Sequence, residues 1–365
     1  MFKTTKNRPV FFEKTSVGKL EKEIWEASKN EINKILKDFR IPSPSELGKM
    51  GSYIQTTPHS EVIKNRRKND VLFIAIGSTE YHGKHLPTGA DTLFVTQILE
   101  GVRRCTLKRG RPVGLAWSPT NYGAHPYHHL GMPGSVIIRE DIMREHLIDV
   151  MLGFWNDGWR KQILVNNHGH FWVLEAAIQQ MEKRYQIPGI FRALDWHRVV
   201  RKFFRTKQDG GEWDTDFVHA DEAETSLALL LVPEMVRMQY AVNTFPRGYF
   251  SDGHIDKAVD RLERPSKWSD GQGHAPIEWF NTPEGVVGKA KLGDAEKAKR
   301  PAAAILKYLV LLADEILEKF PPGKVPPVEE MTFRTKKEMA PFLKEPGSRG
   351  WKPIDALPKI GKYNQ

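Results

Sequence analysis

The sequence has little cysteine and no long apolar run, and both absences limit what the protein can be. Cys105 is the one cysteine in 365 residues, so an internal disulfide framework and a cysteine-ligated structural zinc are excluded. No apolar stretch approaches the ~20 residues that a membrane helix needs. Residues 1–30 also lack the apolar core of a secretory signal. We therefore expect a cytoplasmic protein with no membrane partner.

Clustered basic charge is also missing, although the net charge is +10. Lysine and arginine alternate with glutamate and aspartate, as in "KLEKEIWEASKNEINKILKD", and no arginine-rich run or zinc-finger spacing occurs. A basic excess indicates a nucleic-acid partner only where it is clustered. We expect no such partner, and keep binding through the basic chain ends only as an alternative.

The remaining composition is that of a globular protein, and its pattern predicts three parts. An apolar stripe of helical period over residues 17–39 indicates a helical extension over 1–66, interrupted at Pro42. We expect the main domain over 67–320. The proline- and lysine-rich tail, 321–365, is expected to wrap a surface or a neighbouring subunit, or to be disordered.

The main domain begins with a buried strand. Residues 70–78, "DVLFIAIGS", form a continuous apolar run, which is typical of a strand covered on both faces of a parallel sheet. Strand-like and helix-like segments alternate after it and predict an α/β layered fold with a mostly parallel sheet. Residues 243–288 show little periodicity and are interpreted as loops, with a lid as one interpretation. The further expected strands cover 111–123, 161–170 and 187–197, and the expected helices cover 92–110, 139–158, 171–186, 219–236 and 294–319.

Three polar clusters accompany these elements. Residues 80–91 follow the first strand, 166–171 follow the third, and 219–226 enter a helix. Ligands bind outside the carboxyl ends of parallel strands, so the first two clusters can share one crevice. Carboxylates and imidazoles together suit Zn²⁺ or Mn²⁺. The clusters therefore predict a metal site, in which a carboxylate such as Asp91 bridges two cations and a water between them becomes the nucleophile.

Each cluster also has a plainer interpretation. Asp91 could be the N-cap of the helix that follows it. Glu224 could close a capping box with Asp221. His168 and His170 could be ordinary polar residues at a turn. We favour the metal site, because three unrelated structural roles would otherwise have to meet in one crevice by accident.

Other polar and aromatic residues give weaker signals. His125, His128 and His129 follow the second expected strand, and either line the substrate pocket or order the loop. Trp213 either covers the site or pins a loop to the core. His85 is expected to brace the first loop rather than to bind metal.

These motifs resemble the creatininase family of metal-dependent amidohydrolases. The segments that carry the resemblance are "IGSTEYHGKHLPTGADT", "HHLGMPGS", "VNNHGH", "HADEAETS" and, more weakly, "GVVGKAKLGDAEKAKR". They follow one another in the family's order between residues 67 and 318.

The resemblance implies a three-layer α/β/α fold, a binuclear site with Zn²⁺ or Mn²⁺, and a homo-oligomer such as a hexamer or another ring. It places Asp91 as the bridging ligand, Glu224 as a ligand or an outer support, and His219 as an acid/base or substrate-orienting residue. The metal ligands that it implies by position are Glu80, His82, Asp91 and His168.

Three departures from the family pattern bear on the substrate. Asn167 replaces the usual glycine, and His170 stands where creatininase has a metal-binding glutamate. The second metal therefore falls to His170 or to Glu224. Trp213 does not align cleanly with the tryptophan that closes over creatinine. These differences argue against creatinine as the substrate.

We therefore expect a metal-dependent hydrolase that opens a small cyclic carbonyl substrate, either a cyclic amide or a cyclic diketone derived from inositol or a sugar. His219, with Glu222, would move the proton to the leaving atom. Asn167, His128 and His129 would bind a polar substrate. The alternatives are a formamide or peptide amidohydrolase, and a non-catalytic metal- or sugar-binding member of the fold.

Overall fold

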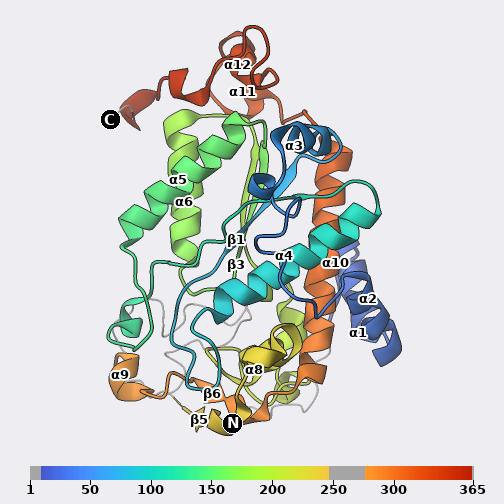
Figure 1. Ribbon diagram of the computed structural model, residues 1–365, viewed down its shortest axis with the longest axis vertical. Helices are drawn as coiled ribbons and strands as arrows, with labels where there is room; N and C mark the ends of the chain where they lie inside the picture. Colours follow the sequence, from blue (N-terminus) through green and yellow to red (C-terminus); the bar gives the residue numbers. More distant parts are fainter. Residues whose placement is uncertain (1–9, 246–275, 364–365) are drawn as a thin grey trace.

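The protein is built on a four-stranded parallel sheet with helices on both faces. Its computed structural model is described here over residues 10–245 and 276–363 (Figure 1). The strands are β1 (Val71–Ile76), β2 (Gly114–Leu115), β3 (Lys161–Asn166) and β4 (Ile190–Asp195), in the spatial order β2-β1-β3-β4. Every pair of neighbours is parallel. The predicted parallel sheet is confirmed.

The apolar run of β1 divides its side chains between two hydrophobic cores. Val71 and Phe73 belong to one core, whereas Leu72 and Ile74 belong to the other. Successive side chains of a strand point to opposite faces, so a strand with a core on each side must be apolar at every position. This explains why β1 shows no polar alternation.

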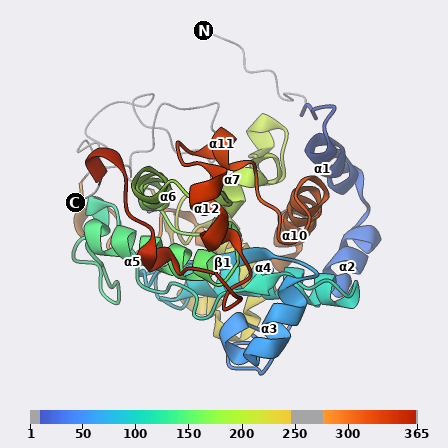
Figure 2. The same ribbon diagram turned by 90° about the horizontal axis from the view of Figure 1, so that it is seen from above.

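The two faces are covered by different sets of helices. Helices α5 (Glu140–Asn156) and α6 (Phe171–Tyr185) gather on one side, and α4 (Ala90–Lys108) and α10 (Ala295–Lys319) lie on the other (Figures 1 and 2). Helix α8 (Glu222–Leu231) packs against α10 and α4. This is the three-layer α/β/α arrangement that the sequence predicts. The shorter elements are α3 (His59–Arg66), α7 (Trp196–Val199), α9 (Glu278–Asn281), β5 (Asn243–Thr244), β6 (Gly288–Lys289) and the 3-10 turn η2 (Tyr127–His129).

The N-terminal stripe forms two helices rather than one. These are α1 (Ser16–Glu26) and α2 (Lys29–Asp38). Ser28 separates them, because its side chain accepts from the backbone N–H of Glu31 and its own N–H donates to the Glu31 carboxylate at 2.8 Å. This capping box starts a new helix inside the apolar pattern. Both helices pack on α10, and their apolar residues join one of the two main cores.

The C-terminal tail packs on the same chain, at the amino ends of the strands (Figure 1). Helices α11 (Val328–Met331) and α12 (Lys336–Leu343) lie in it. The Arg160 guanidinium donates to the carbonyls of Phe342 and Leu343, each at 2.9 Å. The Asp70 carboxylate, just before β1, accepts from Lys161 at 2.6 Å and from the N–H of Gly323 at 2.9 Å. The tail thus wraps a surface of its own chain, while the division into three parts stays a prediction.

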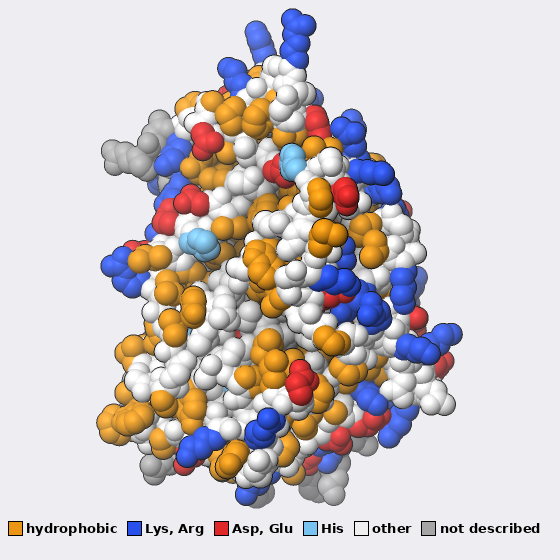
Figure 3. Space-filling view, viewed as in Figure 1, with side chains coloured by type: hydrophobic (Ala, Val, Ile, Leu, Met, Phe, Trp, Pro, Cys, Tyr) orange, Lys and Arg blue, Asp and Glu red, His pale blue; other side chains and the backbone are white. Residues whose placement is uncertain are grey.

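The surface shows no concentration of one charge on the visible face. Lysine and arginine side chains are spread over it and interspersed with acidic and apolar ones (Figure 3). Among the helices of the described residues, none is both long and apolar enough to cross a membrane.

Candidate metal centre

The loop after β1 turns back so that its acidic and imidazole side chains face inward. The N–H of Glu80 donates to the carbonyl of Thr88 at 2.9 Å and closes the loop. Gly83 adopts a positive φ of +66°, which a side chain would strain. Glu80 and His82 are buried as a result, with 4% and 0% of their surfaces exposed.

Asp91 lies in the first turn of α4 but does not cap it. Gly89 is the N-cap residue, and no side chain caps this helix. One oxygen of Asp91 accepts from the Asn167 amide at 2.8 Å, and the N–H of Trp196 in turn donates to the amide oxygen of Asn167. The N-cap interpretation of Asp91 is wrong, because its carboxylate is held toward β3 instead.

A first metal-capable group joins the first and third motifs. His82 Nε2 lies 3.7 Å from an oxygen of Asp91 and 3.6 Å from an oxygen of Glu224. The other ring nitrogen of His82 donates to the carbonyl of Glu80 at 2.9 Å, which directs Nε2 toward the two carboxylates. All three side chains are buried and can hold one cation.

A second group surrounds Glu80. His168 Nε2 lies 3.2 Å from one Glu80 oxygen, and His129 Nε2 lies 3.0 Å from the other. His125 completes this group of four buried residues. The His125 ring contacts the Ser78 hydroxyl at 2.7 Å and His129 Nδ1 at 3.0 Å, so it is fixed in place.

His219 faces both groups with one defined nitrogen. Its Nε2–H donates to the carbonyl of Tyr81 at 2.8 Å, so Nδ1 carries the lone pair. That Nδ1 lies 3.5 Å from Glu80 and 4.0 Å from Glu224. Asp221 is the N-cap of α8 and accepts from the N–H of Ala223 at 2.8 Å and of Glu224 at 3.0 Å. Glu224 does not close a capping box with it, because its carboxylate accepts from the N–H of Ala220 instead.

The carboxylates of the centre carry more negative charge than their surroundings balance. Burial, followed by the charges of Asp91, Glu278 and Glu224, raises the pKa of Glu80 well above its usual range despite the nearby His82. Burial raises the pKa of Glu224 and of Glu278 to about 8 each. Buried like charges at this density need cations or protons to compensate them.

Most of the imidazoles are held neutral. Burial, reinforced by neighbouring rings, lowers the pKa of His168, His129 and His219 well below the usual range. Burial also lowers the pKa of His82, but Asp91 and the other carboxylates raise it by more, so that it ends well above the usual range. Neutral imidazoles are the form that binds metal.

These residues fit divalent cations. Ligand atoms bound at about 2.0–2.2 Å around one tetrahedral cation lie about 3.3–3.6 Å apart. The distances within the two groups, 3.0–3.7 Å, lie within a few tenths of an ångström of that range. In the described residues, His82 Nε2, His168 Nε2 and one oxygen of Asp91 are buried without a hydrogen-bond partner. Unsatisfied buried atoms are costly, so their convergence on shared points favours metal binding.

Two predicted ligands behave differently from expectation. His170 lies behind His168, with its Nδ1 at 2.6 Å from His168 Nδ1 and at 2.8 Å from the carbonyl of Ala124. It belongs to none of the metal-capable groups of the described residues, whereas Glu224 does. The geometry therefore favours Glu224 over His170 as the residue that completes the second metal. The bridging role of Asp91 stays a prediction, because Asp91 belongs to one group, whereas Glu80, His82 and His129 each belong to two.

The catalytic role predicted for Glu222 is at odds with its contacts. Its buried carboxylate accepts from the backbone N–H of Asp214 at 2.9 Å and of Thr215 at 3.1 Å, and pairs with Lys297. These bonds hold the segment before His219 in place. Glu222 is therefore a structural support in this arrangement, not an acid/base partner of His219.

Trp213 is not at the site either. Its side chain is 1% exposed, and its N–H donates to the carbonyl of Phe203 at 2.6 Å. The alternative interpretation, that it pins a loop to the core, is the correct one. His85 braces the first loop as predicted, because its Nε2 contacts the Thr225 hydroxyl at 2.9 Å.

Two residues of the centre were not predicted as site residues. His125 was assigned only to a weak cluster, and Glu278 was not singled out at all. Glu278 lies 3.7 Å from both His128 and His129 and forms a third group with them. No sequence signal identifies Glu278, because it stands in a segment without periodicity or motif. The predicted substrate-binding residue Asn167 contacts Asp91 instead and orients that ligand.

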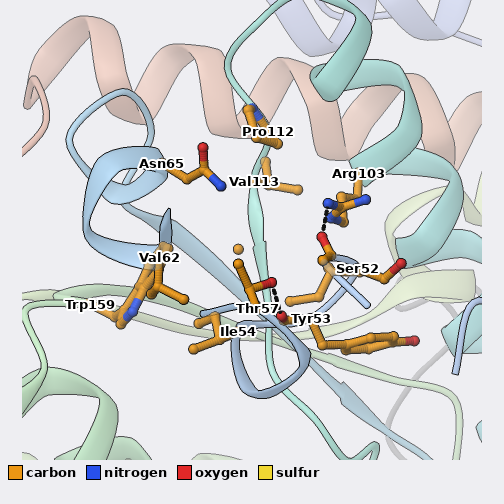
Figure 4. Close-up of a pocket in the computed structure, with 13 residues that line it drawn as sticks. Ser52, Tyr53, Ile54, Thr57, Val62, Asn65, Arg103, Pro112, Val113 and Trp159 are labelled. Atoms are coloured by element: carbon orange, nitrogen blue, oxygen red, sulfur yellow. Dashed lines mark hydrogen bonds between the residues drawn. The ribbon is translucent and has the colours of Figure 1, made fainter. Parts of the chain in front are cut away.

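One of the other described cavities is too small to compete with this centre. It measures about 30 Å³, lies between α3 and β2 and is lined by Tyr53, Asn65, Arg103 and Trp159 among others (Figure 4). It has room for a water molecule, whereas small-molecule pockets measure ~300–1,000 Å³. Its Arg103 side chain is bonded to the carbonyl of Gly51, as Figure 4 shows.

Comparison with known proteins adds independent information. The family model for creatininase, described as creatinine amidohydrolase, matches residues 56–313. The 3-dehydro-scyllo-inosose hydrolase of Thermotoga maritima is 45% identical over 302 residues, which cover 83% of this chain and 95% of that protein.

Solved structures show a similar fold. A protein described as a creatinine amidohydrolase from Bacteroides fragilis is 24% identical, with a TM-score of 0.56, over 72% of this chain and 95% of that one. A structure named Creatininase Mn is 19% identical, with a TM-score of 0.52, over 74% of this chain and 99% of that one.

Proposed function

Because the chain belongs to the creatininase family of hydrolases, we propose that its substrate is a polyhydroxylated cyclic ketone of the dehydro-inosose type. The relative at 45% identity is named for hydrolysis of 3-dehydro-scyllo-inosose, and it is aligned over nearly its whole length. The observation that carries the proposal is the convergence of buried carboxylates and neutral imidazoles on Glu80 and His82.

We propose two divalent cations, Zn²⁺ or Mn²⁺, in the centre. One would be held by His82, Asp91 and Glu224, and the other by Glu80 with His168 and His129. Solved relatives whose names carry Zn-Zn or Mn support this choice. When bound, such ions supply an activated water and polarise a carbonyl group.

The protein's own groups provide the proton transfer. His219 presents its bare Nδ1 to the centre while Tyr81 fixes the ring through Nε2–H. This nitrogen can take a proton from the attacking water and deliver it to the leaving atom. For a diketone, water adds its oxygen to the carbonyl carbon, the bond to the neighbouring ring carbon breaks, and that carbon takes the proton. The ring opens, and the product is one chain that carries a carboxylate at the attacked carbon and keeps the other carbonyl as a ketone.

The surrounding groups keep this chemistry in place. Asn167 holds Asp91, and His170 supports the ring of His168. Every member of the groups except His125 is at least nine-tenths buried, which limits the access of bulk water. Such burial strengthens the electrostatic interactions at the reacting atoms.

The experiment is hydrolysis of 3-dehydro-scyllo-inosose by the holoenzyme, with formation of the carboxylate product followed by NMR. Creatinine, a formamide and a short peptide serve as amide substrates in parallel. We expect turnover of the dehydro-inosose, its loss after EDTA treatment and its return with Zn²⁺ or Mn²⁺. Activity that is indifferent to chelation, or confined to the amides, contradicts the proposal. We further propose that the protein is cytoplasmic and forms a homo-oligomer. Light scattering after size exclusion tests the oligomeric state.

A further inference from the structure

Trp196 is a fully buried tryptophan that is bonded to a side chain of the metal centre. It is 0% exposed and opens the short helix α7, directly after β4. Its indole N–H donates to the amide oxygen of Asn167, which is buried as well. The NH₂ group of the same amide donates to Asp91 at 2.8 Å. Trp196 therefore stands one bond behind the residue that holds a predicted metal ligand.

The register of the sheet places Trp196 beside Asn167. In the pairing of β3 with β4, Asn166 lies opposite Asp195, and its amide donates to the Asp195 carboxylate at 3.1 Å. Asn167 and Trp196 are the next residues along the two chains. The N–H of Asn167 also donates to the carbonyl of Ile76, the last residue of β1, at 3.1 Å. These contacts join the carboxyl ends of β4, β3 and β1, where the metal-capable residues gather.

The direction of each bond in this chain follows from its chemistry. An indole N–H can only donate, and an ionised carboxylate can only accept. The amide of Asn167 must therefore turn its oxygen toward Trp196 and its NH₂ group toward Asp91. In the flipped orientation, two donors would face each other at one end and two acceptors at the other. Trp196 thus selects the amide orientation that supports Asp91.

The bond from Asn167 orients the Asp91 carboxylate and leaves it open to a cation. The oxygen that accepts this bond, Oδ1, lies 3.7 Å from His82 Nε2. The other oxygen, Oδ2, is buried without a hydrogen-bond partner in the part of the chain that the structure describes. A ligand held in this way by a supporting hydrogen bond binds metal more tightly than one that must first be ordered.

Core packing alone does not account for the partner of Trp196. A buried tryptophan needs an acceptor for its N–H, and a backbone carbonyl is sufficient. Trp155 has such a partner, because its N–H donates to the carbonyl of Pro188 at 2.9 Å. Trp196 is bonded instead to a side chain, at the position where asparagine replaces the usual glycine of the family pattern. A glycine has no side chain to accept from Trp196 or to donate to Asp91.

We propose that Trp196 is a positioning residue, which fixes the amide of Asn167 and through it holds Asp91 in place for a cation. The inference rests on the proposed metal centre. It gives Trp196 no contact with the substrate and no step of the reaction. The property that Trp196 controls is the affinity of the centre for metal.

The test is a double-mutant cycle on metal affinity. Trp196→Phe keeps a buried aromatic ring and removes the N–H, and it is combined with Asn167→Ala. Competition with a chelator measures the Zn²⁺ affinity of each full-length protein. The matched control is Trp155→Phe, which also removes a buried indole N–H and its bond to an acceptor. Circular dichroism shows which variants are folded.

We expect Trp196→Phe to weaken Zn²⁺ binding about 10-fold in the otherwise wild-type chain. In the Asn167→Ala background the same change should alter the affinity by less than about 2-fold, because no amide remains to be oriented. Trp155→Phe should bind Zn²⁺ as the wild type does. An unchanged affinity in Trp196→Phe, an equal loss in both backgrounds, or the same loss in Trp155→Phe overturns the proposal.

If Trp196→Phe does not fold, NMR of ¹⁵N-tryptophan-labelled protein tests the same contact. The indole resonance that differs between metal-free wild type and metal-free Asn167→Ala identifies Trp196. We expect this resonance to shift when Zn²⁺ is added to the wild type, and to shift much less in Asn167→Ala. The absence of such a resonance, or an equal response in the two proteins, overturns the proposal.

The outcome is separable from that of the proposed function. A wild type that binds Zn²⁺ and shows the coupling, but does not cleave the dehydro-inosose, supports the role of Trp196 and refutes the function. A wild type that binds Zn²⁺ without the coupling overturns the role of Trp196 alone. A wild type that binds neither Zn²⁺ nor Mn²⁺ overturns both.

Discussion

His82 Nε2 and Glu224 Oε2 lie 3.6 Å apart, one in the loop after β1 and the other in the first turn of α8. This distance is too long for a hydrogen bond and suits two ligands of one cation. The contact joins two motifs that are far apart in the sequence. It is therefore a sensitive place to test the metal centre.

Glu224→Gln is expected to remove one of two bound cations. The amide is a weaker ligand than a carboxylate, and the charge that balances the cation is lost. We expect metal content to fall from two ions per chain toward one, with a loss of activity of more than about 100-fold. Mass spectrometry of the purified protein measures the metal. Glu318→Gln, at an exposed acid of α10, should keep both ions.

Asn167→Ala is expected to weaken metal binding without removing a ligand. Its amide donates to Asp91 at 2.8 Å, and this bond orients the carboxylate. Loss of such a supporting contact lowers metal affinity about 10- to 100-fold. Competition with a chelator of known affinity measures the change. The exposed Asn33→Ala is the control, and equal affinities in the two variants would show that Asn167 has no such role.

Metal removal is expected to lower stability as well as activity. The buried carboxylates of Glu80, Asp91 and Glu224 repel one another without cations. A ligand at about 1,000 times its dissociation constant stabilises the folded state by about 4 kcal/mol. Thermal unfolding with and without EDTA should therefore show a marked drop in Tm, restored by Zn²⁺ or Mn²⁺. An unchanged Tm in protein shown to be metal-free would argue against metal in this centre.

The His85 pKa predicts a loss of stability in mild acid. Burial, together with the charge on His82, lowers the pKa of His85 to about 4, whereas the unfolded value is about 6.5. The unfolded chain therefore binds the proton first. The contribution of His85 is complete above about pH 6.5 and is lost as the pH falls toward 4. It amounts to as much as about 3 kcal/mol.

Urea unfolding at pH 7 and pH 4.5 measures this effect, with His85→Gln compared with the wild type. The variant should lose less of its unfolding free energy between the two pH values. His59→Gln, at a largely exposed histidine, is the control and should follow the wild type. Equal losses in all three proteins would show that His85 does not contribute.

Glu222→Gln separates a structural role from a catalytic one. The Glu222 carboxylate supports the backbone of Asp214 and Thr215 and pairs with Lys297. Hydrogen bonds to a charged group contribute about 1.5–3 kcal/mol to stability, and the neutral amide keeps only part of this. Lys297 is 23% exposed and still pairs with Asp214, so it is not left as a buried unpaired charge. We expect a lower Tm, unchanged metal content and an unchanged pH profile of kcat in the folded variant. A shifted pH profile of kcat would instead indicate that Glu222 takes part in acid/base catalysis.

Much of the fold can be predicted from local patterns. The uninterrupted apolar run of β1 requires cover on both faces, and this requirement leads to the layered arrangement. The split between α1 and α2 is missed, because the apolar stripe continues across Ser28 while the capping box depends on two polar side chains. The apolar periodicity there predicts one continuous helix, whereas the capping box at Ser28 starts a new one. The capping box determines the observed structure.

The centre is only partly predictable for a different reason. Glu80, His82 and Asp91 stand together in one motif, so their chemistry is visible in the sequence. Glu278 is brought to the centre by the tertiary fold of the chain, and no local sequence motif identifies it. The prediction that Trp213 binds substrate failed for a similar reason. The same local sequence can place a tryptophan of an irregular segment either in a core or over a ligand.

The segment of residues 285–288 also bears on the order in which the centre can be completed during synthesis. Residues 285–288 leave the ribosome after all three motifs, yet they pack against Tyr81 and Asp221 and bond to the backbone of His219. Before these residues are synthesised, the loops that carry the metal-capable residues lack the contacts that this segment makes with them. A nascent chain that ends before residue 285 therefore lacks contacts that position the metal-capable residues. We expect metal to bind after this segment has been synthesised.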